Sequence, residues 1–278
     1  MCRNFKFTII GFMKDKLNEK ERENLRSTNQ ERFGARSPAY RASVVHGGGE
    51  DLDRLIELLA THEGVRALDI ATGAGHVAAA LAATGAEVTA CDLTFNMLRE
   101  AKANLASRGF KAEYVQADAL DLPFADASFD AVAARMAPHH FADPARFLRE
   151  VFRVLLPGGS FGLVDQAAPE QKAAAEAINT FEKLRDPSHN RQLSLGEWQG
   201  LARATGFAIR SAELIHKPVD FDSWTSIQNA SEEIRQKLSA QLGDGPAEAR
   251  EWYRPEFREN GMIARFSMPH TILLAVKP

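Results

Sequence analysis

Cysteine is almost absent from this chain. Only two of its 278 residues are cysteines, Cys2 and Cys91, and they lie far apart in neither a metal-binding nor a redox spacing. This usage argues against a disulfide framework and favours a reducing compartment. We therefore expect a cytoplasmic protein.

Long apolar runs and an excess of positive charge are missing as well. No stretch approaches the roughly 20 apolar residues of a membrane span. The net charge of -3 provides none of the positive field with which nucleic-acid binders hold phosphates. The short apolar run from Phe5 to Met13 resembles a weak signal sequence, but it has no small-residue cleavage site and charged residues follow at once. We expect a small-molecule substrate, no nucleic acid and no membrane span, and we leave a homodimer open.

What the chain does contain is an alternation of apolar, strand-like runs with helical patterns. The strand-like runs are VRALDIA, AEVTACD, KAEYVQA, FDAVAAR and GSFGLVD. Such alternation is typical of βαβ units in a parallel sheet, and right-handed crossovers make that sheet doubly wound. Towards the C-terminus, FAIRSAELI predicts a strand, and MIARFS with HTILLAVKP predicts a final pair of strands.

The stretch LDIATGAGHVAAALA, residues 68–82, ends a predicted strand in a glycine turn and begins a helix. Gly73 and Gly75 allow the backbone to approach a ligand, and the helix start offers unpaired N–H groups. Dinucleotides and S-adenosylmethionine are both bound at such turns. Gly73 to Ala78 fits the dinucleotide pattern G-x-G-x-x-G/A, and Asp92 at the end of the next strand is placed to hold a ribose. The turn alone leaves both cofactors open.

Three further segments follow in order, TACDLTFNML, VQADALDLPFADASFDAV and REVFRVLLPGGSFGLVD. Together with LDIATGAGHVA they resemble the class I S-adenosylmethionine-dependent methyltransferases, and most closely the type 11, ubiquinone/menaquinone-biosynthesis-like branch. The resemblance is strong over residues 62–168 and looser from Ala35 onward. It implies S-adenosyl-L-methionine as cofactor, S-adenosyl-L-homocysteine as product, and a mostly parallel, seven-stranded Rossmann-like sheet whose last strand is antiparallel.

The resemblance also implies roles for individual residues. Asp92 would accept hydrogen bonds from both ribose hydroxyls, and Asp118 would accept one from the adenine amino group. A carboxylate at a strand end can also simply cap the next helix, and for Asp69 ligand contact and turn-holding both stay open. The resemblance and the glycine turn together give the expected cofactor residues as Asp69, Gly73, Gly75, Asp92, Leu93, Asp118, Ala119 and Arg135.

The methyl acceptor should lie near the ends of the fourth and fifth strands, which read RMAPHHF and VDQAAPE, because ligands of open α/β sheets bind outside the carboxyl ends of strands. His139 and His140 are the candidate catalytic bases, since imidazole titrates near neutrality. A base is needed only if the acceptor must lose a proton, and either histidine could instead pack or cap the following helix. Further candidate substrate residues are Tyr40, His46, Asp165, Arg185 and His189. The spacing of these groups matches no recognised ligand set, so we expect no metal.

The chain length is near the upper limit for one hydrophobic core. Residues 1–36 are highly charged and predict a helical N-terminal extension. We predict a single methyltransferase domain over residues 37–278. Its cofactor-binding core would span residues 62–168, with lid and substrate segments at 37–61 and 169–260.

We therefore predict S-adenosylmethionine-dependent methyl transfer to an O, N, S or C nucleophile of a small molecule. An NAD-dependent oxidoreductase would need a hydride partner such as a Tyr-x-x-x-Lys pair, and Tyr40, Tyr114 and Tyr253 stand in no such pattern. The same fold with another methyl donor or acceptor, or in a non-methylating role, stays open as an alternative.

Overall fold

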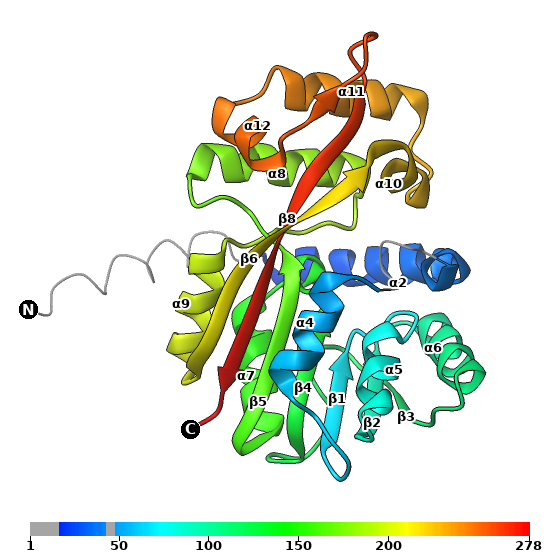
Figure 1. The fold of residues 1–278 in the computed structure, drawn as a ribbon, viewed down its shortest axis with the longest axis vertical. Helices are drawn as coiled ribbons and strands as arrows, with labels where there is room; N and C mark the ends of the chain where they lie inside the picture. Colours follow the sequence, from blue (N-terminus) through cyan, green and yellow to red (C-terminus); the bar gives the residue numbers. More distant parts are fainter. Residues whose placement is uncertain (1–16, 43–47) are drawn as a thin grey trace, which may run out of the picture.

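The computed structural model describes residues 17–42 and 48–278, with side chains described from residue 17 to 34 and from 48 onward. A central sheet carries helices on both faces, and a second, smaller lobe lies beyond one end of the sheet (Figure 1). The expectations for Cys2, for the apolar run at residues 5–13 and for His46 lie outside the described residues.

The sheet has the order β3-β2-β1-β4-β5-β8-β6, in which the first five strands are mutually parallel and β8 runs antiparallel to both of its neighbours. The predicted mostly parallel, seven-stranded sheet is confirmed, with the short strand β7 added beside β8. The strands are β1 (Arg66–Ile70), β2 (Glu87–Asp92), β3 (Glu113–Gln116), β4 (Phe129–Arg135), β5 (Leu155–Gln166), β6 (Ala208–Asp220), β7 (Glu256–Phe257) and β8 (Ile263–Val276). The strand order reverses between β1 and β4, which is where open α/β sheets bind ligands.

The predicted final pair of strands is wrong, because Ile263–Val276 forms the single strand β8. Pro269 does not interrupt this strand, although proline cannot donate a hydrogen bond to a sheet. It lies where β5 ends, one residue beyond the pair Gln166 and His270. There Pro269 contributes only its carbonyl, which accepts a hydrogen bond from the Ala167 N–H at 2.8 Å.

The helices follow the local signals of the sequence. Helix α9 begins with a reciprocal capping box between Ser194 and Glu197 and ends at Gly206, whose φ of 113° suits glycine. The described helices are α2 (Glu19–Ala42), α4 (Glu50–Leu59), α5 (His76–Ala83), α6 (Phe95–Ser107), α7 (Pro144–Val154), α8 (Lys172–Arg185), α9 (Leu195–Thr205), α10 (Phe221–Ile227), α11 (Glu232–Gly243) and α12 (Ala247–Tyr253), with a 3₁₀ turn, η1, at Pro138–His140. Helix α2 continues through Pro38 to Ala42.

Both faces of the sheet are apolar, as burial on both sides requires. Along β1, Leu68 and Ile70 belong to the core that packs against α7 and α9. Ala67, which precedes Leu68 and points to the other face, belongs to the opposite core, which includes Leu55 of α4 and Leu81 of α5. This alternation explains why the strands appear in the sequence as nearly continuous apolar runs.

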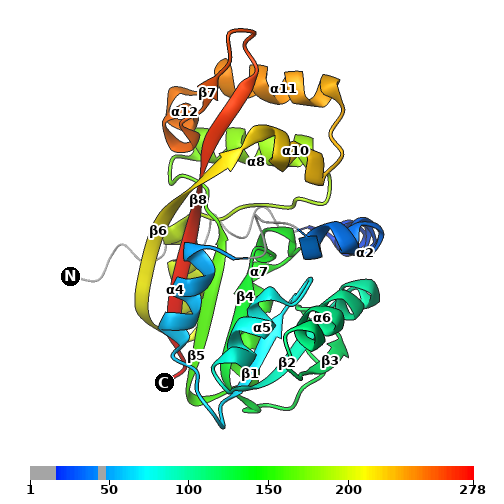
Figure 2. The same ribbon diagram turned by 45° about the vertical axis from the view of Figure 1, so that its right-hand side comes forward.

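The second lobe has a hydrophobic core of its own. Phe181 of α8 stacks on Trp224 of α10 with their ring centroids 5.4 Å apart, and Tyr253 of α12 and Phe266 of β8 pack beside them. Strands β6 and β8 are long enough to leave the main sheet and enter this lobe (Figure 2). Much of the predicted lid segment at residues 169–260 thus forms a separately packed body over the carboxyl ends of the parallel strands.

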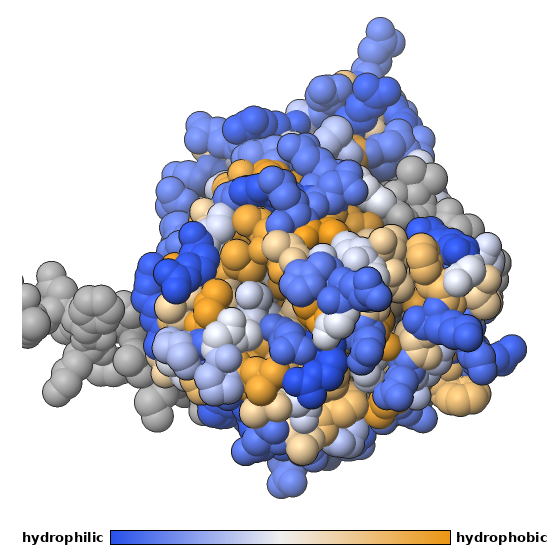
Figure 3. All heavy atoms as spheres, turned by 60° about the horizontal axis from the view of Figure 1, so that its bottom comes forward, coloured by the Kyte–Doolittle hydropathy of each residue, from blue (hydrophilic) through white to orange (hydrophobic). Residues whose placement is uncertain are grey.

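Helix α2 lies between the main sheet and the second lobe and packs against α6 (Figures 1 and 2). The predicted boundary at residue 36 falls inside this helix. None of the described helices is long and apolar enough to cross a membrane. At the end of the molecule opposite the second lobe, apolar and hydrophilic side chains are interspersed (Figure 3), which is ordinary for a protein surface.

Candidate active site

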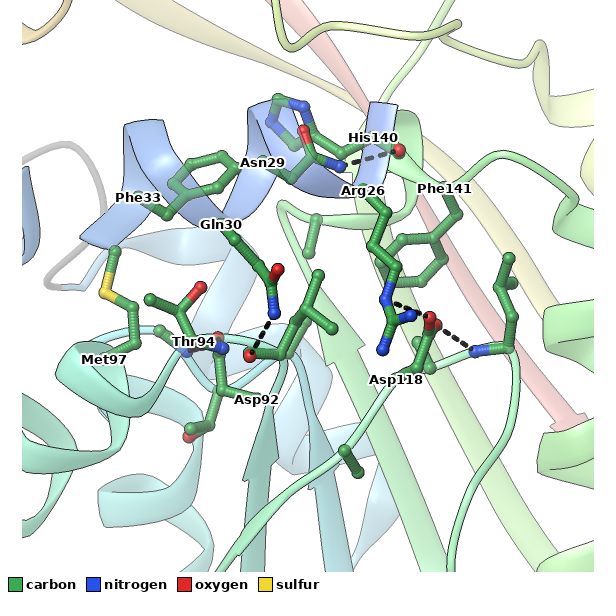
Figure 4. A pocket seen from close by; sticks show the side chains of 18 of the residues that line it. Arg26, Asn29, Gln30, Phe33, Asp92, Thr94, Met97, Asp118, His140 and Phe141 are labelled. Carbon is green, nitrogen blue, oxygen red and sulfur yellow. Dashed lines mark hydrogen bonds and ion pairs between the residues drawn. The ribbon is translucent and has the colours of Figure 1, made fainter. Parts of the chain in front are cut away.

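A cavity of about 870 Å³ lies at the carboxyl ends of β1, β2 and β4, beneath α2 (Figure 4). Its walls come from the glycine turn after β1, the ends of β2 and β4, the loop after β3, the turn η1 and one face of α2. All of the predicted cofactor residues line it except Gly75. The volume lies near the top of the range of about 300–1,000 Å³ for small-molecule sites.

The two glycines of the turn have different surroundings. Gly73 has a φ of 53° and open space where a Cβ would lie, so a ligand can approach its backbone closely. Gly75 does not line the cavity, and a Cβ there would fall 2.9 Å from Ala101 and Leu105 of α6. The expectation that Gly75 approaches the cofactor is therefore corrected, because its place is in the packing of α5 against α6.

Asp69 holds the turn from below. Its Oδ2 accepts a hydrogen bond from the Thr72 hydroxyl at 2.6 Å and another from the Ala78 N–H at 3.0 Å. Burial raises the pKa of Asp69 to about 7, against the lowering effect of these two donors. These two hydrogen bonds support the interpretation that Asp69 holds the turn. Asp69 also lines the cavity, so contact with a ligand stays open.

Asp92 joins the end of β2 to the glycine turn. Its Oδ2 accepts from the Gly73 N–H at 2.9 Å and its Oδ1 from the Thr94 N–H at 2.8 Å. Burial raises the pKa of Asp92 to about 6, and both backbone donors oppose that rise. Each carboxylate oxygen retains a further lone pair with which it can accept from a ligand.

Asp118 lies across the cavity in the loop after β3. Its Oδ1 accepts from the Leu120 N–H at 2.9 Å, and its Oδ2 pairs with Arg26 Nε at 3.3 Å. Figure 4 shows Arg26 reaching down from α2 to this carboxylate. A ligand amino group at Asp118 must therefore share the carboxylate with a residue that we did not predict.

Helix α2 forms the roof of the cavity through one face. The Gln30 amide donates to the Leu93 carbonyl at 3.4 Å, and the Asn29 amide donates to the His140 carbonyl at 3.3 Å (Figure 4). The Phe33 ring meets the His140 ring edge-on, with centroids 4.9 Å apart. In the sequence, the only feature that marks these residues is helical spacing within a strongly charged segment. Their place in the roof of the cavity was therefore not predicted.

Arg135 is held at the cavity wall by an acid that the sequence did not reveal. Its Nε donates to Oδ2 of Asp51 at 2.8 Å, and Asp51 is fully buried in the first turn of α4. Lys217 Nζ lies 3.1 Å from Oδ1 of the same carboxylate. Burial works to raise the pKa of Asp51, but His270, Arg135 and Lys217 together hold it well below its ordinary value. Acids are common in the first turn of a helix, so the sequence does not reveal that Asp51 contacts several cationic side chains.

The two adjacent histidines differ in position and in charge. His140 lines the cavity, and its Nδ1 donates to the Ser188 carbonyl at 2.9 Å. Burial, followed by the neighbouring His139, lowers the pKa of His140 to about 3. His139 lies behind the cavity with its Nδ1 2.6 Å from Oδ1 of Asp165. Burial alone would lower the pKa of His139, but the Asp165 carboxylate raises it above the ordinary value.

The remaining predicted substrate residues do not line the large cavity. His189 is buried, with its Nε2 2.9 Å from the Asn179 side-chain oxygen, so it does not reach over the site. Asp165 lies behind His139, and the Tyr40 side chain is outside the described part of the chain. Arg185 faces a second, smaller cavity.

In the RDPSH segment, Asp186 makes the most polar contacts, and we did not predict a role for it. Its carboxylate accepts from the Ser188 N–H at 2.9 Å, from the Ser188 hydroxyl, and from the Gln228 amide at 2.7 Å. Arg32 of α2 pairs with it at 3.3 Å. This acid therefore ties α2 to the second lobe.

The smaller cavity, which we call the inner chamber, has a volume of about 30 Å³. It lies between the two lobes and is lined by Phe33, Met136, His139, His140, Gln166, Arg185, Asp186 and Gln228. Among the described residues, no group of three or more His, Cys, Asp and Glu side chains is placed to hold a metal ion.

Comparison with known proteins gives a consistent set of relatives. Residues 68–163 match the family described as a methyltransferase domain. An uncharacterised methyltransferase of Bacillus subtilis, YcgJ, is 34% identical over 251 residues, which are 90% of this chain and 99% of that protein. The demethylmenaquinone methyltransferase of Clavibacter sepedonicus is 39% identical over 125 residues, 45% of this chain and 51% of that enzyme. A crystal structure from Bacillus halodurans has a TM-score of 0.79 at 36% identity and covers 83% of this chain and 100% of its own.

Proposed function

This chain belongs to the methyltransferase family, and from that premise we propose that it transfers the methyl group of S-adenosylmethionine to a small-molecule acceptor, leaving S-adenosylhomocysteine. The observation that carries the proposal is the large cavity, where the open Gly73 turn and the carboxylate of Asp92 face the same space. Its 870 Å³ is large enough for a nucleoside-sized cofactor together with part of an acceptor. The bound cofactor supplies a methyl group already activated by a positively charged sulfur.

The chain's own residues would bind and orient the two reactants. Asp92 accepts from the ribose hydroxyls, Leu93 packs against the adenine, and Asp118 accepts from the adenine amino group. The N–H of Ala119 donates to a ring nitrogen, and Arg135 closes the far wall. Holding the acceptor in line with the methyl group, in a cavity that α2 shields from water, accounts for much of the expected rate enhancement.

The acceptor would enter between the main sheet and the second lobe, next to η1. His140 lines the cavity there, and His139 lines the inner chamber behind it. We propose that one of these two side chains takes a proton where the acceptor must lose one. Cytoplasmic location and a homodimer stay predictions from the sequence.

Calorimetry with S-adenosylhomocysteine and with NAD tests the cofactor assignment on wild-type protein. We expect S-adenosylhomocysteine to bind and NAD to give no heat. The matched pair of variants is Asp92→Ala and Asp244→Ala, the latter replacing an exposed carboxylate at the end of α11. Only Asp92→Ala should weaken binding, and tight NAD binding without S-adenosylhomocysteine binding would reverse the proposal. A panel of phenols, amines and thiols, followed by release of S-adenosylhomocysteine, then searches for the acceptor.

A further inference from the structure

The inner chamber adjoins the place where the methyl acceptor would lie. Phe33, Met136 and His140 line both cavities, so the inner chamber and the large cavity share a wall. A volume of about 30 Å³ suits one group the size of a water molecule. One functional group of an acceptor can therefore be enclosed there while the rest of that molecule lies in the large cavity.

Two hydrogen-bond donors of the chamber wall have no partner in the described part of the chain. Arg185 is 9% exposed, its terminal nitrogen pairs with Glu182 at 3.2 Å, and its Nε is buried without a hydrogen bond. Its guanidinium also lies 4.2 Å from the centre of the Trp224 ring, which fixes its position. Gln166 accepts at Oε1 from the Gln192 amide at 2.6 Å, so its own NH₂ group is left to donate. A buried donor without an acceptor is costly, which makes this wall a site for an oxygen atom.

The acceptors of the chamber wall are largely used. The carboxylate of Asp186 already accepts from Ser188, Gln228 and Arg32. His139 is different, because its Nδ1 is engaged by Asp165 and its Nε2 has no hydrogen-bond partner among the described residues. The chamber therefore offers two donors and one basic nitrogen. A hydroxyl group satisfies all three, whereas an ammonium group carries only donors.

We propose that the inner chamber holds the reacting oxygen of a phenol-like or enol-like hydroxyl acceptor, with His139 as its base and with Arg185 and Gln166 donating to the developing oxyanion. This inference rests on the proposed methyl transfer. The oxygen forms a new O–C bond to the methyl group as the C–S bond breaks and its electron pair returns to sulfur. The hydroxyl proton passes to Nε2 of His139. The products are the methyl ether, the neutral sulfide and an imidazolium paired with Asp165.

His139 suits this role better than His140. A carboxylate that accepts from Nδ1 fixes the tautomer and stabilises the imidazolium, as in other catalytic histidine–carboxylate pairs. The Asp165 carboxylate, with Glu182 and Asp186 beyond it, raises the pKa of His139 against the effect of burial. The nearby cationic groups are Arg185 and Arg32, and His140 and His189 both have lowered pKa values and stay neutral.

The test uses 4-nitrophenol, a hydroxyl compound whose deprotonated form absorbs visible light. The full-length protein is saturated with S-adenosylhomocysteine and titrated with 4-nitrophenol at a pH where the free compound is mostly protonated. We expect wild-type protein to bind it as the phenolate and to produce the visible absorbance. His139→Gln should abolish that absorbance. Gln166→Leu should retain the base and weaken binding about tenfold through one lost donor.

The matched control is His62→Gln, which replaces an exposed histidine in the loop after α4 and should behave as wild type. Calorimetry with S-adenosylhomocysteine on every variant separates the two proposals. If wild-type protein does not bind S-adenosylhomocysteine, the proposed function fails and this inference fails with it. If it binds S-adenosylhomocysteine but shows no phenolate, or if His139→Gln and Gln166→Leu both match wild type, the inner-chamber proposal alone is overturned.

Discussion

Replacing Asp92 with asparagine should weaken the cofactor site and remove a cost of folding at the same time. The carboxylate is 8% exposed and accepts the N–H groups of Gly73 and Thr94. An asparagine can accept through only one of its two terminal atoms, so one of these donors would meet an NH₂ group. Two charge-assisted hydrogen bonds to the ribose would also be lost or weakened, which predicts about 2–4 kcal/mol less affinity for S-adenosylhomocysteine.

The folding effect follows from the pKa of Asp92, which burial raises from 3.8 to about 6. A raised pKa in an acid means that the folded state disfavours the charged form. Stability is therefore lost as the pH rises from about 4 to about 6, and the loss is complete above that window. A pKa of about 6 in place of 3.8 corresponds to about 3 kcal/mol of free energy of unfolding lost at neutral pH. The carboxylate of Asp92 therefore destabilises the ligand-free protein at neutral pH.

Urea unfolding of wild type and Asp92→Asn between pH 4 and 7, without ligand, measures this effect, and calorimetry at pH 7 measures the affinity. The free energy of unfolding of the wild type should fall relative to that of the variant across this range. Equal pH dependence in the two proteins would refute the argument from burial. Wild-type affinity in a folded Asp92→Asn protein would refute the ribose role.

Three other substitutions test contacts around the cavity. Gly75→Ala should lower the free energy of unfolding in urea by about 1–3 kcal/mol more than Gly109→Ala does. Both glycines have a φ of 78°, but only at Gly75 would a Cβ meet neighbouring atoms. Equal losses in the two variants would contradict the packing role of Gly75. Asp51→Asn removes the negative charge beside buried Arg135 and should lower the free energy of unfolding by about 3–5 kcal/mol; a loss below about 1 kcal/mol would show that Arg135 is held by other groups. Arg26→Ala should change S-adenosylhomocysteine affinity, measured by calorimetry, by less than about fivefold, since this half-exposed ion pair contributes about 1 kcal/mol at most; a change above tenfold would mean that Arg26 contacts the cofactor itself.

Sequence reasoning reached the parts of the site that depend on local chain geometry. The role of Gly73 in a ligand-facing turn can be predicted because the strand, the glycine turn and the start of the helix all lie within residues 68–82. Asp92 follows from its place at a strand end, which parallel pairing brings to the same edge of the sheet as the glycine turn. Asp118 was expected only from the resemblance to the class I methyltransferases. For Gly75 the same local signal misled, because a glycine that allows ligand approach and one that allows close helix packing look alike in a sequence.

Contacts between distant segments could not be predicted in this way. Asp51 becomes a hub only because Arg135, Lys217 and His270 arrive from three different strands. Asp186 likewise finds its partners on distant segments, Arg32 on α2 and Gln228 in the second lobe. In the sequence, each of these charged side chains looks like an ordinary surface residue. Its partners become known only when the fold buries it among them.

Helix α2 is the clearest case, and it changes how the site should be understood. Its charged sequence predicts a solvated extension, yet Arg26 and Gln30 contact the edge of the main sheet while Arg32 contacts Asp186 near the second lobe. The charges serve as polar contacts across the cavity roof, which explains why a helix of low apolar content is held there. Because these contacts are few and partly exposed, α2 is easier to displace than the sheet beneath it. The reactants would then enter from the side that α2 covers, and the residues proposed to bind the cofactor, Gly73, Asp92 and Asp118, lie beneath it at and just after the strand ends.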